Sequence, residues 1–550
     1  MSVFAYMPFG AGGIIIRVET DIRRGIPGVD ISGLAEGAVR EARDRIRAAF
    51  RNSGFDFPQD RILINLAPAG LKKDGASLDL PIALSVMSAA GIVPIPGNLI
   101  VMGELELSGK IRPVHGVLAA IASGLAEGIT EFIVPAENAG EAAILSEKGA
   151  RFIAAENLQG AVHALFIREE KGILPVSFED HQKSMQDKFM QANNNSINDG
   201  ELYTSIKPMN NISSAESTGD FADVCGQSVY KRALEIAAAG GHNILVFGPP
   251  GAGKTMLARR MPSIMMPLSA DEAVEVTRLH SLAGPFRSNG SFIDRLITHP
   301  PFRAPHHTAS AEGILGGGRI PRPGEISLAH FGILFLDEAP EFRINVLQSL
   351  REPLEDKVIS IVRADGVVKL PAEFQLLMTA NPCRCGRLGM RETDCTCLCS
   401  PEEINRYWRK FSGPLLDRVE IRAAVFPPKI EELSRKGHFN TEEKSSCFAK
   451  RVKKAIDIQR YRFKETGIRR NALIPANMTS KFCQMNEKAE NALLVSITKL
   501  GLSGRAFHGI LRVARTIADL ENKEIIEIEH ILEAIQHRRL GDDPWDIMSV

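Results

Sequence analysis

The chain has 550 residues, of which 44% are hydrophobic and 24% are charged, values typical of a soluble globular protein with three or four domains. Lysine plus arginine number 66 and aspartate plus glutamate also number 66, so the formal net charge is zero. A globally basic surface is therefore excluded, and any contact with nucleic acid has to come from a local patch.

The N-terminal residues lack the charged region that opens a signal peptide. Residues 80–103 carry no charge, but prolines and glycines interrupt this stretch, which favours a short helix and a separate strand over a membrane span. Five of the eight cysteines are crowded between Cys383 and Cys399 and do not resemble a secreted disulfide framework. We expect a cytoplasmic protein with no membrane contact.

Residues 1–166 are predicted to form a first domain of short strands and helices. Residues 14–19 and 61–66 have the apolar, β-branched composition of strands. Between them, residues 34–50 show helical spacing with charges on one face.

Within this domain, the segment KKDGAS (72–77) resembles the nucleophile loop of the Lon-type serine–lysine proteases, with Ser77 at the nucleophile position. That family places its basic lysine two residues after a glycine, where this chain has Leu118 after Gly116 and Val117. A serine hydroxyl without an adjacent base is a weak nucleophile. We therefore expect a Lon-protease-like α+β domain, of the ribosomal S5 domain 2-like type, that lacks the catalytic lysine; an active protease is the minor alternative.

The composition changes over residues 167–219, which are rich in Ser, Asn, Asp and Gln and poor in apolar anchors. Such a segment cannot bury enough surface to offset its ordering entropy, so we interpret it as a flexible linker. A second unit begins at residue 220. There, residues 220–224 are predicted to form a strand beside the nucleotide, and residues 228–239 a helix.

The sequence GPPGAGKT follows an apolar, strand-like run over residues 243–247 and leads into a helical run. Strand, glycine-rich loop and helix form the context in which G-x-x-x-x-G-K-[ST] binds a nucleoside triphosphate. The glycines let backbone N–H groups face the phosphates, Lys254 can reach the β- and γ-phosphates, and the Thr255 hydroxyl can hold Mg²⁺. The predicted phosphate-binding residues are Gly248, Pro249, Pro250, Gly251, Ala252, Gly253, Lys254 and Thr255.

A second apolar run, residues 332–336, ends in Asp337 and Glu338. A buried parallel strand has this pattern when it delivers carboxylates to a site. We predict that Asp337 binds Mg²⁺ through water and that Glu338 polarises the attacking water, although an acidic surface pair is the ordinary alternative. Asn381 ends the next buried strand, where it would orient water or the γ-phosphate, or else cap the turn before Pro382.

The sequence also predicts the structure of three further segments in the second half of the chain. Residues 302–325, rich in Gly, Pro and His, are predicted to be an insertion with turns and basic residues rather than a packed element. Residues 358–363 and 367–370 flank an Asp-Gly pair and are predicted to form a hairpin. From residue 428 onward the pattern is helical.

In this order, GPPGAGKT, LFLDE, TAN, SGPLLDR and SGRAFH resemble the AAA+ ATPases of the magnesium-chelatase-like group. PFRAPHHTAS, NPCRCG and ARTIADL are similar to signatures of the ComM/YifB family, and the resemblance covers the chain except for the linker. It implies a parallel-sheet AAA+ core over residues 220–427 and a C-terminal helical lid over residues 428–550. It also implies ATP and Mg²⁺ as cofactors, and a ring, expected to be a hexamer, with ATP between neighbouring subunits.

The resemblance also assigns roles to single residues. Arg418 matches the arginine finger, which would act in trans on the γ-phosphate of the next subunit. Asn381 matches the first, polar sensor, and Arg505 matches the second sensor, in the lid. With Glu338, these residues form the predicted catalytic set.

The insertion and the hairpin match the loops that such rings point into a central pore, where basic residues would contact a DNA backbone. For each basic residue taken alone, a solvated surface charge is the more common role. The candidate DNA contacts are Arg319, Arg322, Arg363 and Lys369.

The crowded cysteines form two C-x-C pairs that match the family, Cys383 with Cys385 and Cys397 with Cys399, and Cys395 is additional. Four thiolates can bind a structural Zn²⁺ tetrahedrally. Reduced cysteines in a loop are the alternative, because C-x-C is less diagnostic than C-x-x-C.

We therefore predict a ring-forming AAA+ ATPase that couples ATP hydrolysis to translocation on single-stranded or branched DNA. By resemblance to the family, this helicase-type activity would drive branch migration while incoming DNA recombines during natural transformation. The alternative is a chelatase-type chaperone ATPase that remodels a protein partner. It would share every catalytic residue and differ only in what enters the pore.

Overall fold

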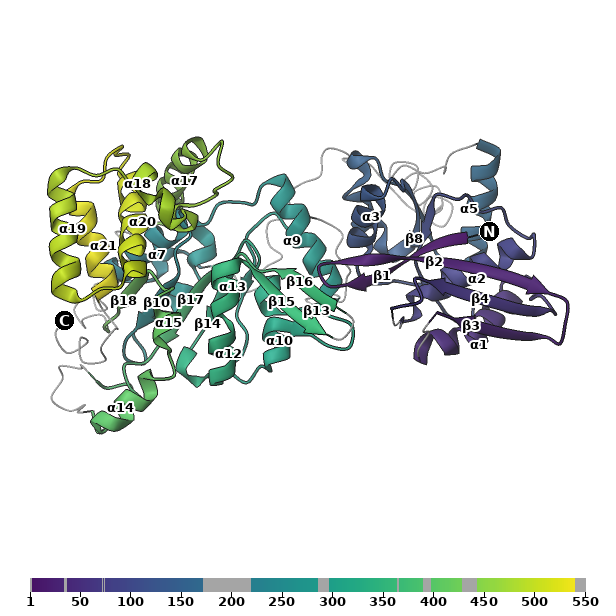
Figure 1. Cartoon of the computed structure of the whole chain (residues 1–550), viewed down its shortest axis with the longest axis horizontal. Coiled ribbons are helices and arrows are strands. Elements are labelled where there is room, and N and C mark those ends of the chain that lie inside the picture. Colours follow the sequence, from purple (N-terminus) through teal and green to yellow (C-terminus); the bar gives the residue numbers. More distant parts are fainter. Residues whose placement is uncertain are drawn as a thin grey trace, which may run out of the picture.

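The computed structural model describes residues 2–33, 37–71, 73, 75–171, 219–284, 296–363, 366–388, 397–427 and 443–539. Apart from its two ends, the predicted linker lies outside the described residues, as does Cys395. An N-terminal domain lies beside a larger unit that contains the core and the lid (Figure 1). No helix within the described ranges is long and apolar enough to span a membrane.

The N-terminal domain is built on a seven-stranded mixed sheet in the order β3-β4-β2-β1-β5-β8-β9. Side chains alternate across the sheet, so Val3 and Ala5 join one core with α1, α2 and α5, whereas Tyr6 joins another with α3 and α4. The strands are β1 (Ser2–Phe9), β2 (Gly12–Arg23), β3 (Gly28–Ser32), β4 (Arg61–Ala67), β5 (Leu99–Val101), β8 (Glu131–Pro135) and β9 (Arg151–Ala155), with a separate pair β6 (Glu104–Leu105) and β7 (Ile111–Arg112). The helices are α1 (Gly37–Asn52), α2 (Asp79–Ala89), α3 (Val117–Ala126), α4 (Ala139–Ala143) and α5 (Leu158–Lys171).

The structure confirms the five elements that the sequence predicted in this domain. The strands expected at residues 14–19 and 61–66 lie within β2 and β4, and the expected helix is α1. The uncharged stretch divides into α2 and β5, as predicted. The expected linker boundary at residue 167 falls too early, because α5 continues to Lys171.

The core is a five-stranded parallel sheet in the order β11-β14-β17-β10-β18. The four residues of β10 and of β14 are all buried, which explains their unbroken apolar sequences. The strands are β10 (Ile244–Phe247), β11 (Phe302–Arg303), β14 (Ile333–Leu336), β17 (Gln375–Ala380) and β18 (Ile421–Ala424). The helices are α7 (Ser228–Gly240), α8 (Lys254–Ala258), α9 (Ala270–Ala283), α12 (Ile344–Ser349), α13 (Arg351–Asp356), α14 (Pro401–Trp408) and α15 (Gly413–Leu416).

The strand predicted at residues 220–224 is wrong. Residues Phe221–Asp223 form a 3₁₀ turn, because the Asp220 carboxylate accepts the Ala222 N–H while the Asp223 carboxylate accepts the Asp220 N–H. Reciprocal caps of this kind favour a helical start over an extended chain.

The prediction that residues 302–325 form no packed element is also wrong. β11 joins the core sheet beside β14, and the Phe302 and Phe335 rings lie 5.5 Å apart. Arg303 forms a bidentate ion pair with Glu325, with both N–O distances 2.7 Å. The remaining elements here are α10 (Ala311–Leu315), β12 (Gly316–Gly317), β13 (Arg322–Pro323) and α11 (Glu325–Leu328).

The predicted hairpin is confirmed as β15 (Val358–Arg363) and β16 (Gly366–Pro371), paired antiparallel. It lies beside the β12–β13 pair and next to the turn between β1 and β2 of the N-terminal domain (Figure 1). The Gly10 N–H in that turn donates to the Pro321 carbonyl at 3.2 Å. A Cβ on Gly10 would lie 2.5 Å from Cγ1 of Val368, so the turn directly abuts the hairpin.

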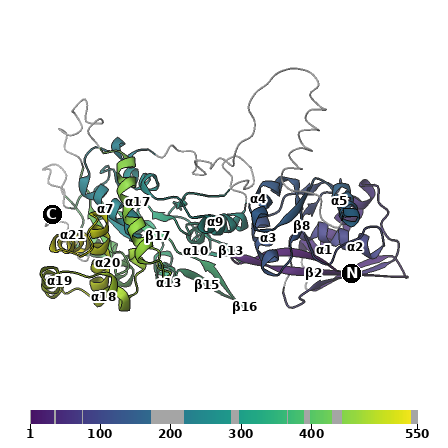
Figure 2. The same ribbon diagram turned by 90° about the horizontal axis from the view of Figure 1, so that it is seen from above.

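The N-terminal domain also contacts α9, which Figure 2 shows beside α3. Leu282 of α9 belongs to the apolar cluster of α3. The Ser281 hydroxyl donates to the buried Glu141 carboxylate, and Lys148 lies 3.4 Å from Asp271. The domain is thus fixed to the core at α9 and at the hairpin.

The lid is helical, as predicted, and shares one apolar cluster with α7 and β10 of the core. Its described helices are α17 (Ser445–Arg462), α18 (Thr479–Phe482), α19 (Glu487–Leu500), α20 (Gly504–Leu520) and α21 (Ile528–Arg539). The buried His242 ring accepts or donates a 2.8 Å hydrogen bond with Thr516, which ties the core to α20. The lid therefore packs directly against the core sheet.

Candidate active site

The phosphate loop lies between β10 and α8, as predicted. Gly251 and Gly253 have φ angles of 79° and 83°, a left-handed conformation that glycine adopts without steric cost. A Cβ on Gly248 would lie 2.0 Å from the carbonyl oxygen of Val425, so only glycine fits at the end of the strand. The backbone is therefore shaped to approach phosphates closely.

Lys254 is almost fully buried, with 9% of its surface exposed. Its Nζ donates to the carbonyls of Gly248 (2.6 Å) and Pro249 (2.9 Å) and to Oδ1 of Asn381 (3.1 Å). Burial lowers the pKa of Lys254 to about 8, against the opposing attraction of Asp337 and Glu338. An arriving phosphate would replace the two carbonyls and restore full charge to the amine.

Asp337 follows β14 and faces the start of α8. Both of its carboxylate oxygens lie 3.0 Å from the Thr255 hydroxyl, and Thr379 Oγ1 donates to Oδ1 at 2.5 Å. A carboxylate and a hydroxyl at this separation provide the oxygen ligands that Mg²⁺ prefers. The sequence did not single out Thr379, although its place at the end of the neighbouring strand β17 was a usable signal.

Glu338 is exposed and has a φ of 51°, which is strained for a residue other than glycine. Its N–H donates to Thr379 Oγ1 at 3.0 Å, and this bond holds the backbone in place. Glu338 is therefore held at the end of β14 with its side chain exposed to solvent. Strain of this kind is typical of functional positions.

The two arginines of the predicted catalytic set, Arg418 and Arg505, lie where the amino ends of the core strands meet, which we call the amino edge of the sheet. The phosphate loop lies at the opposite, carboxyl edge. Asn243, the residue before β10, donates through Nδ2 to the Arg418 carbonyl at 2.8 Å. The phosphate loop follows the opposite end of β10, about 13 Å away for a strand of four residues. Arg418 therefore does not reach the phosphate loop of its own chain.

Arg505 lies with Arg418 and not with Lys254. Both guanidinium groups form ion pairs with Glu355, and the Arg505 Nη2–Glu355 Oε1 distance is 2.9 Å. These two arginines lower the pKa of the Glu355 carboxyl, the hydrogen bond from Arg418 having the largest effect. Sequence analysis assigned no role to Glu355, which nothing in its local pattern distinguishes from other exposed acids of α13.

A cavity of about 850 Å³ adjoins this pair, between the amino ends of the core strands and the lid. Three further arginines line it: Arg469, Arg470 and Arg512. Burial and the nearby Arg460 lower the pKa of Arg470 to about 10. Five acidic residues also line the cavity, so its charge is mixed: Glu272, Glu355, Glu373, Asp417 and Glu420.

The four predicted DNA contacts are exposed and lie on two adjoining hairpins. Arg363 Nη1 donates to the Arg319 carbonyl at 3.1 Å, which joins the tip of β15 to the β12–β13 turn. Lys369 and Arg322 lie further down the two hairpins. Segments more than forty residues apart in the chain therefore form one basic edge.

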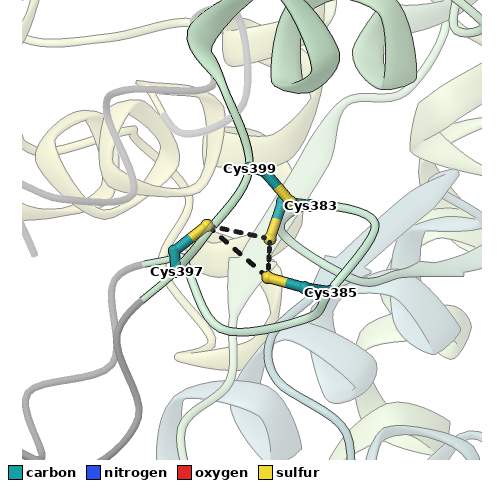
Figure 3. Close-up of side chains that lie close together, drawn as sticks. All are labelled: Cys383, Cys385, Cys397 and Cys399. Carbon is teal, nitrogen blue, oxygen red and sulfur yellow. Dashed lines mark hydrogen bonds between the residues drawn. The ribbon is translucent and has the colours of Figure 1, made fainter.

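The four paired cysteines come together after β17 and before α14 (Figure 3). Their sulfur atoms all lie within 4.8 Å of one another, and Cys383 Sγ is 3.3 Å from Cys385 Sγ. Cys397 Sγ is 3.6 Å from Cys383 Sγ and 3.5 Å from Cys385 Sγ. This cluster has the composition and spacing of a metal-binding site.

Two described residues bear on the serine–lysine dyad that the sequence is expected to lack, whereas Lys72 lies outside the described residues. Leu118 is buried in α3, and its N–H donates to Glu141 at 2.7 Å. The nearby Lys73 is fully buried, and its amine donates to three backbone carbonyls, those of Gly33, Pro68 and Leu71. Lys73 is therefore committed to its own loop, which leaves it unsuited to act as a base for Ser77.

The parallel sheet, the phosphate loop and the Thr255–Asp337 pair define a P-loop ATPase of the AAA+ type. The family model described as magnesium chelatase, subunit ChlI, matches residues 220–433. The models for subunit ChlI of Mg-chelatase and for the ChlI C-terminal region match residues 18–138 and 442–538.

Full-length relatives agree with these matches. YifB of Salmonella typhimurium is 38% identical over 528 residues, which cover 96% of this chain and 94% of that protein. Competence protein ComM of Haemophilus influenzae is 36% identical over 540 residues, covering 98% and 97%. The chain belongs to the ComM/YifB family of magnesium-chelatase-like ATPases. A Lon protease of Clostridioides difficile is 28% identical over 133 residues, 23% of this chain and 17% of that protein.

Proposed function

We propose that this protein is a ring-forming motor that couples ATP hydrolysis to movement along DNA and drives branch migration when incoming DNA recombines. A relative named for competence and similar over almost its whole length supports this proposal. So does a basic edge built from two hairpins. The proposal places the protein in the cytoplasm, where ATP and incoming DNA meet.

The carboxyl edge of the sheet would bind and hydrolyse ATP. Lys254 would bind the β- and γ-phosphates, while Thr255 and Asp337 would hold Mg²⁺ directly and through water. Bound Mg²⁺ neutralises charge on the phosphates. Glu338 would orient the attacking water, and Asn381, which already contacts the Lys254 amine, would detect the γ-phosphate.

The placement of Arg418 carries the proposal of a ring. It lies at the amino edge, one strand length from its own phosphate loop, which supports a role for its side chain in the site of a neighbouring subunit. Arg505 shares the same carboxylate and would act on the same neighbour. We expect a ring of six subunits. Each subunit would supply the phosphate loop of one ATP site and the two arginines of the neighbouring site.

The basic side chains of the two hairpins would contact the negatively charged phosphates of DNA. Arg363 and Arg319 adjoin, and Lys369 lies on the same hairpin. Contacts to phosphates release counterions, so they weaken steeply with salt.

The decisive experiment measures ATP hydrolysis with and without single-stranded or forked DNA, at low and at high salt. We expect stimulation at low salt that declines as salt rises. Arg363→Ala should weaken DNA binding and reduce the slope of log affinity against log salt by about one. Lys453→Ala, which removes an exposed lysine of the lid, is the matched control and should leave both unchanged. Hydrolysis that is indifferent to DNA at low salt rejects the DNA motor.

One observation favours a second candidate, a chaperone ATPase that remodels a protein. Val362 and Val367 pair across the hairpin tip and are 75% and 58% exposed. An exposed apolar pair is better suited to another protein's side chains than to phosphates. If DNA has no effect while Val362→Ser and Val367→Ser together lower ATP-dependent activity on a protein partner, this candidate replaces the first.

The proposal also includes a zinc ion at the cysteine cluster. Four sulfur ligands in a closed arrangement suit structural Zn²⁺ better than Mg²⁺ or Ca²⁺, which prefer oxygen.

A further inference from the structure

The cysteine cluster is attached on both sides to parts of the nucleotide site. We propose that its metal is a structural zinc ion that fixes Asn381 and the phosphate loop, so that zinc occupancy controls nucleotide affinity. This inference rests on the proposed ATPase function and adds a means of controlling it.

The sulfur geometry fits zinc. A Zn–S distance of about 2.3 Å in a tetrahedron places the sulfurs about 3.8 Å apart. Three of the distances between sulfurs are 3.3, 3.5 and 3.6 Å, close to that edge and far longer than the roughly 2 Å of a disulfide. The sulfurs come from two separate segments, Cys383 with Cys385 and Cys397 with Cys399, and point toward one centre (Figure 3).

Burial raises the pKa of the Cys383 thiol, and the backbone around the first pair opposes this effect. The N–H of Leu388 is hydrogen-bonded to the sulfur of Cys383, and that of Arg387 to the sulfur of Cys385. Donors directed at sulfur stabilise its anionic form, which is the form that binds a metal. Arg387 is exposed and Arg384 lies between the paired cysteines, so cationic side chains flank the ligands.

The first connection to the nucleotide site runs through the ligand loop itself. Asn381, two residues before Cys383, accepts the Lys254 amine at 3.1 Å. On the other side of the pair, a Cβ on Gly386 would lie 2.6 Å from Cδ of Pro250. The loop that carries two ligands is therefore in direct contact with the phosphate loop.

The second connection runs through α14. This helix begins directly after Cys399, with Ser400 as its capping residue. At its far end, Trp408 Nε1 donates to the Pro382 carbonyl at 2.9 Å, and its ring lies edge-on to Phe247, the last residue of β10. A metal bound by both cysteine pairs would therefore link the loop that follows Asn381 to the start of α14. The Trp408 contacts already link the end of α14 to that loop and to the end of β10.

Without the metal, α14 is joined to the loop after Asn381 by the Trp408 hydrogen bond and to the end of β10 by the packing of the Trp408 ring. The segment carrying Asn381 would then sample more conformations, and ATP binding would have to order it again. A shift of about 1 Å at a positioning group can cost a factor of up to about 100. We expect about a tenfold loss of nucleotide affinity when zinc is absent.

The test uses the full chain. Zinc is measured by inductively coupled plasma mass spectrometry, and affinity by titration with a fluorescent ATP analogue. The wild type should contain one zinc per chain, and Cys397→Ser should lose it and bind the analogue about tenfold more weakly. Cys447→Ser, at an exposed cysteine of α17 outside the cluster, should match the wild type in both.

Asn381→Ala provides the complementary variant, because it should keep its zinc and still lose affinity. If Cys397→Ser does not fold, chelation of the folded wild type followed by return of zinc measures the same coupling. Protein without zinc overturns the metal assignment, and zinc-free protein with wild-type affinity overturns the coupling. A wild type that fails to bind the analogue at all refutes the ATPase function instead, which keeps the two failures distinct.

Discussion

At the carboxyl edge of the core sheet, hydrogen bonds within one chain join Lys254 to Asn381 and Thr255 to Asp337. At the amino edge, Arg418 and Arg505 converge instead on one carboxylate, Glu355. At the first edge a buried amine is held beside a glycine-rich loop, whereas at the second edge the two arginines are neutralised by a carboxylate of their own chain. Under the proposed function, the first edge binds ATP and the second acts on the ATP of a neighbouring subunit.

The largest effect should come from the carboxyl edge. Lys254→Ala removes the buried amine that we propose binds the phosphates, and we expect ATP affinity to fall by at least about 100-fold, since charge-assisted bonds in a buried site are strong. Isothermal titration calorimetry measures the loss. Lys453→Ala should bind ATP normally, and an unchanged affinity in Lys254→Ala would mean that the predicted loop is not the site.

Arg418→Ala should reduce ATP hydrolysis without reducing ATP binding, because it changes only the amino edge. If Arg418 is the arginine finger that we propose, kcat should fall by about 1,000-fold while ATP affinity changes little. Mixing these subunits with Glu338→Gln subunits should restore part of the activity, because each variant supplies the half that the other lacks. An equal loss of affinity and kcat in Arg418→Ala would place the arginine in the site of its own chain.

The pH dependence of ATP affinity should reflect Lys254. Its pKa of about 8 means that the amine is charged at pH 7 and becomes neutral above pH 8. Phosphate binding requires the charged form, so affinity should be constant from about pH 6.5 to 7.5 and fall by up to about tenfold per pH unit above pH 8. Lys254→Arg stays charged throughout and should show no such fall, although it binds more weakly.

The smallest effect should come from Glu355→Gln. An incoming phosphate has to displace this carboxylate from Arg418 and Arg505, so its removal should raise DNA-independent ATP hydrolysis. The pair is partly exposed, which limits the gain to about two- to fivefold. Glu352→Gln on the same helix is the control. A fall in kcat as large as that of Arg418→Ala would show that Glu355 positions the finger instead of competing for it.

Most of the carboxyl edge was predictable because its residues follow apolar strands directly. A parallel strand that is buried on both faces has an unbroken apolar sequence, so Asp337 and Asn381 could be placed at strand ends from the sequence. The segment at residues 220–224 was mispredicted because two aspartates cap a turn there, and β11 was missed because its two residues are too short to show a pattern.

The sequence by itself determined the phosphate loop, the acidic pair Asp337 and Glu338, the helical lid and the two C-x-C pairs. Each of these features depends on neighbouring residues or on periodicity. Only the tertiary structure decided that Arg505 joins Arg418 at the far edge and that Glu355 holds both. It also decided that the sulfurs of two distant pairs share one centre against the phosphate loop. These relations depend on how strands and helices pack between segments up to 150 residues apart, and no local pattern encodes such contacts.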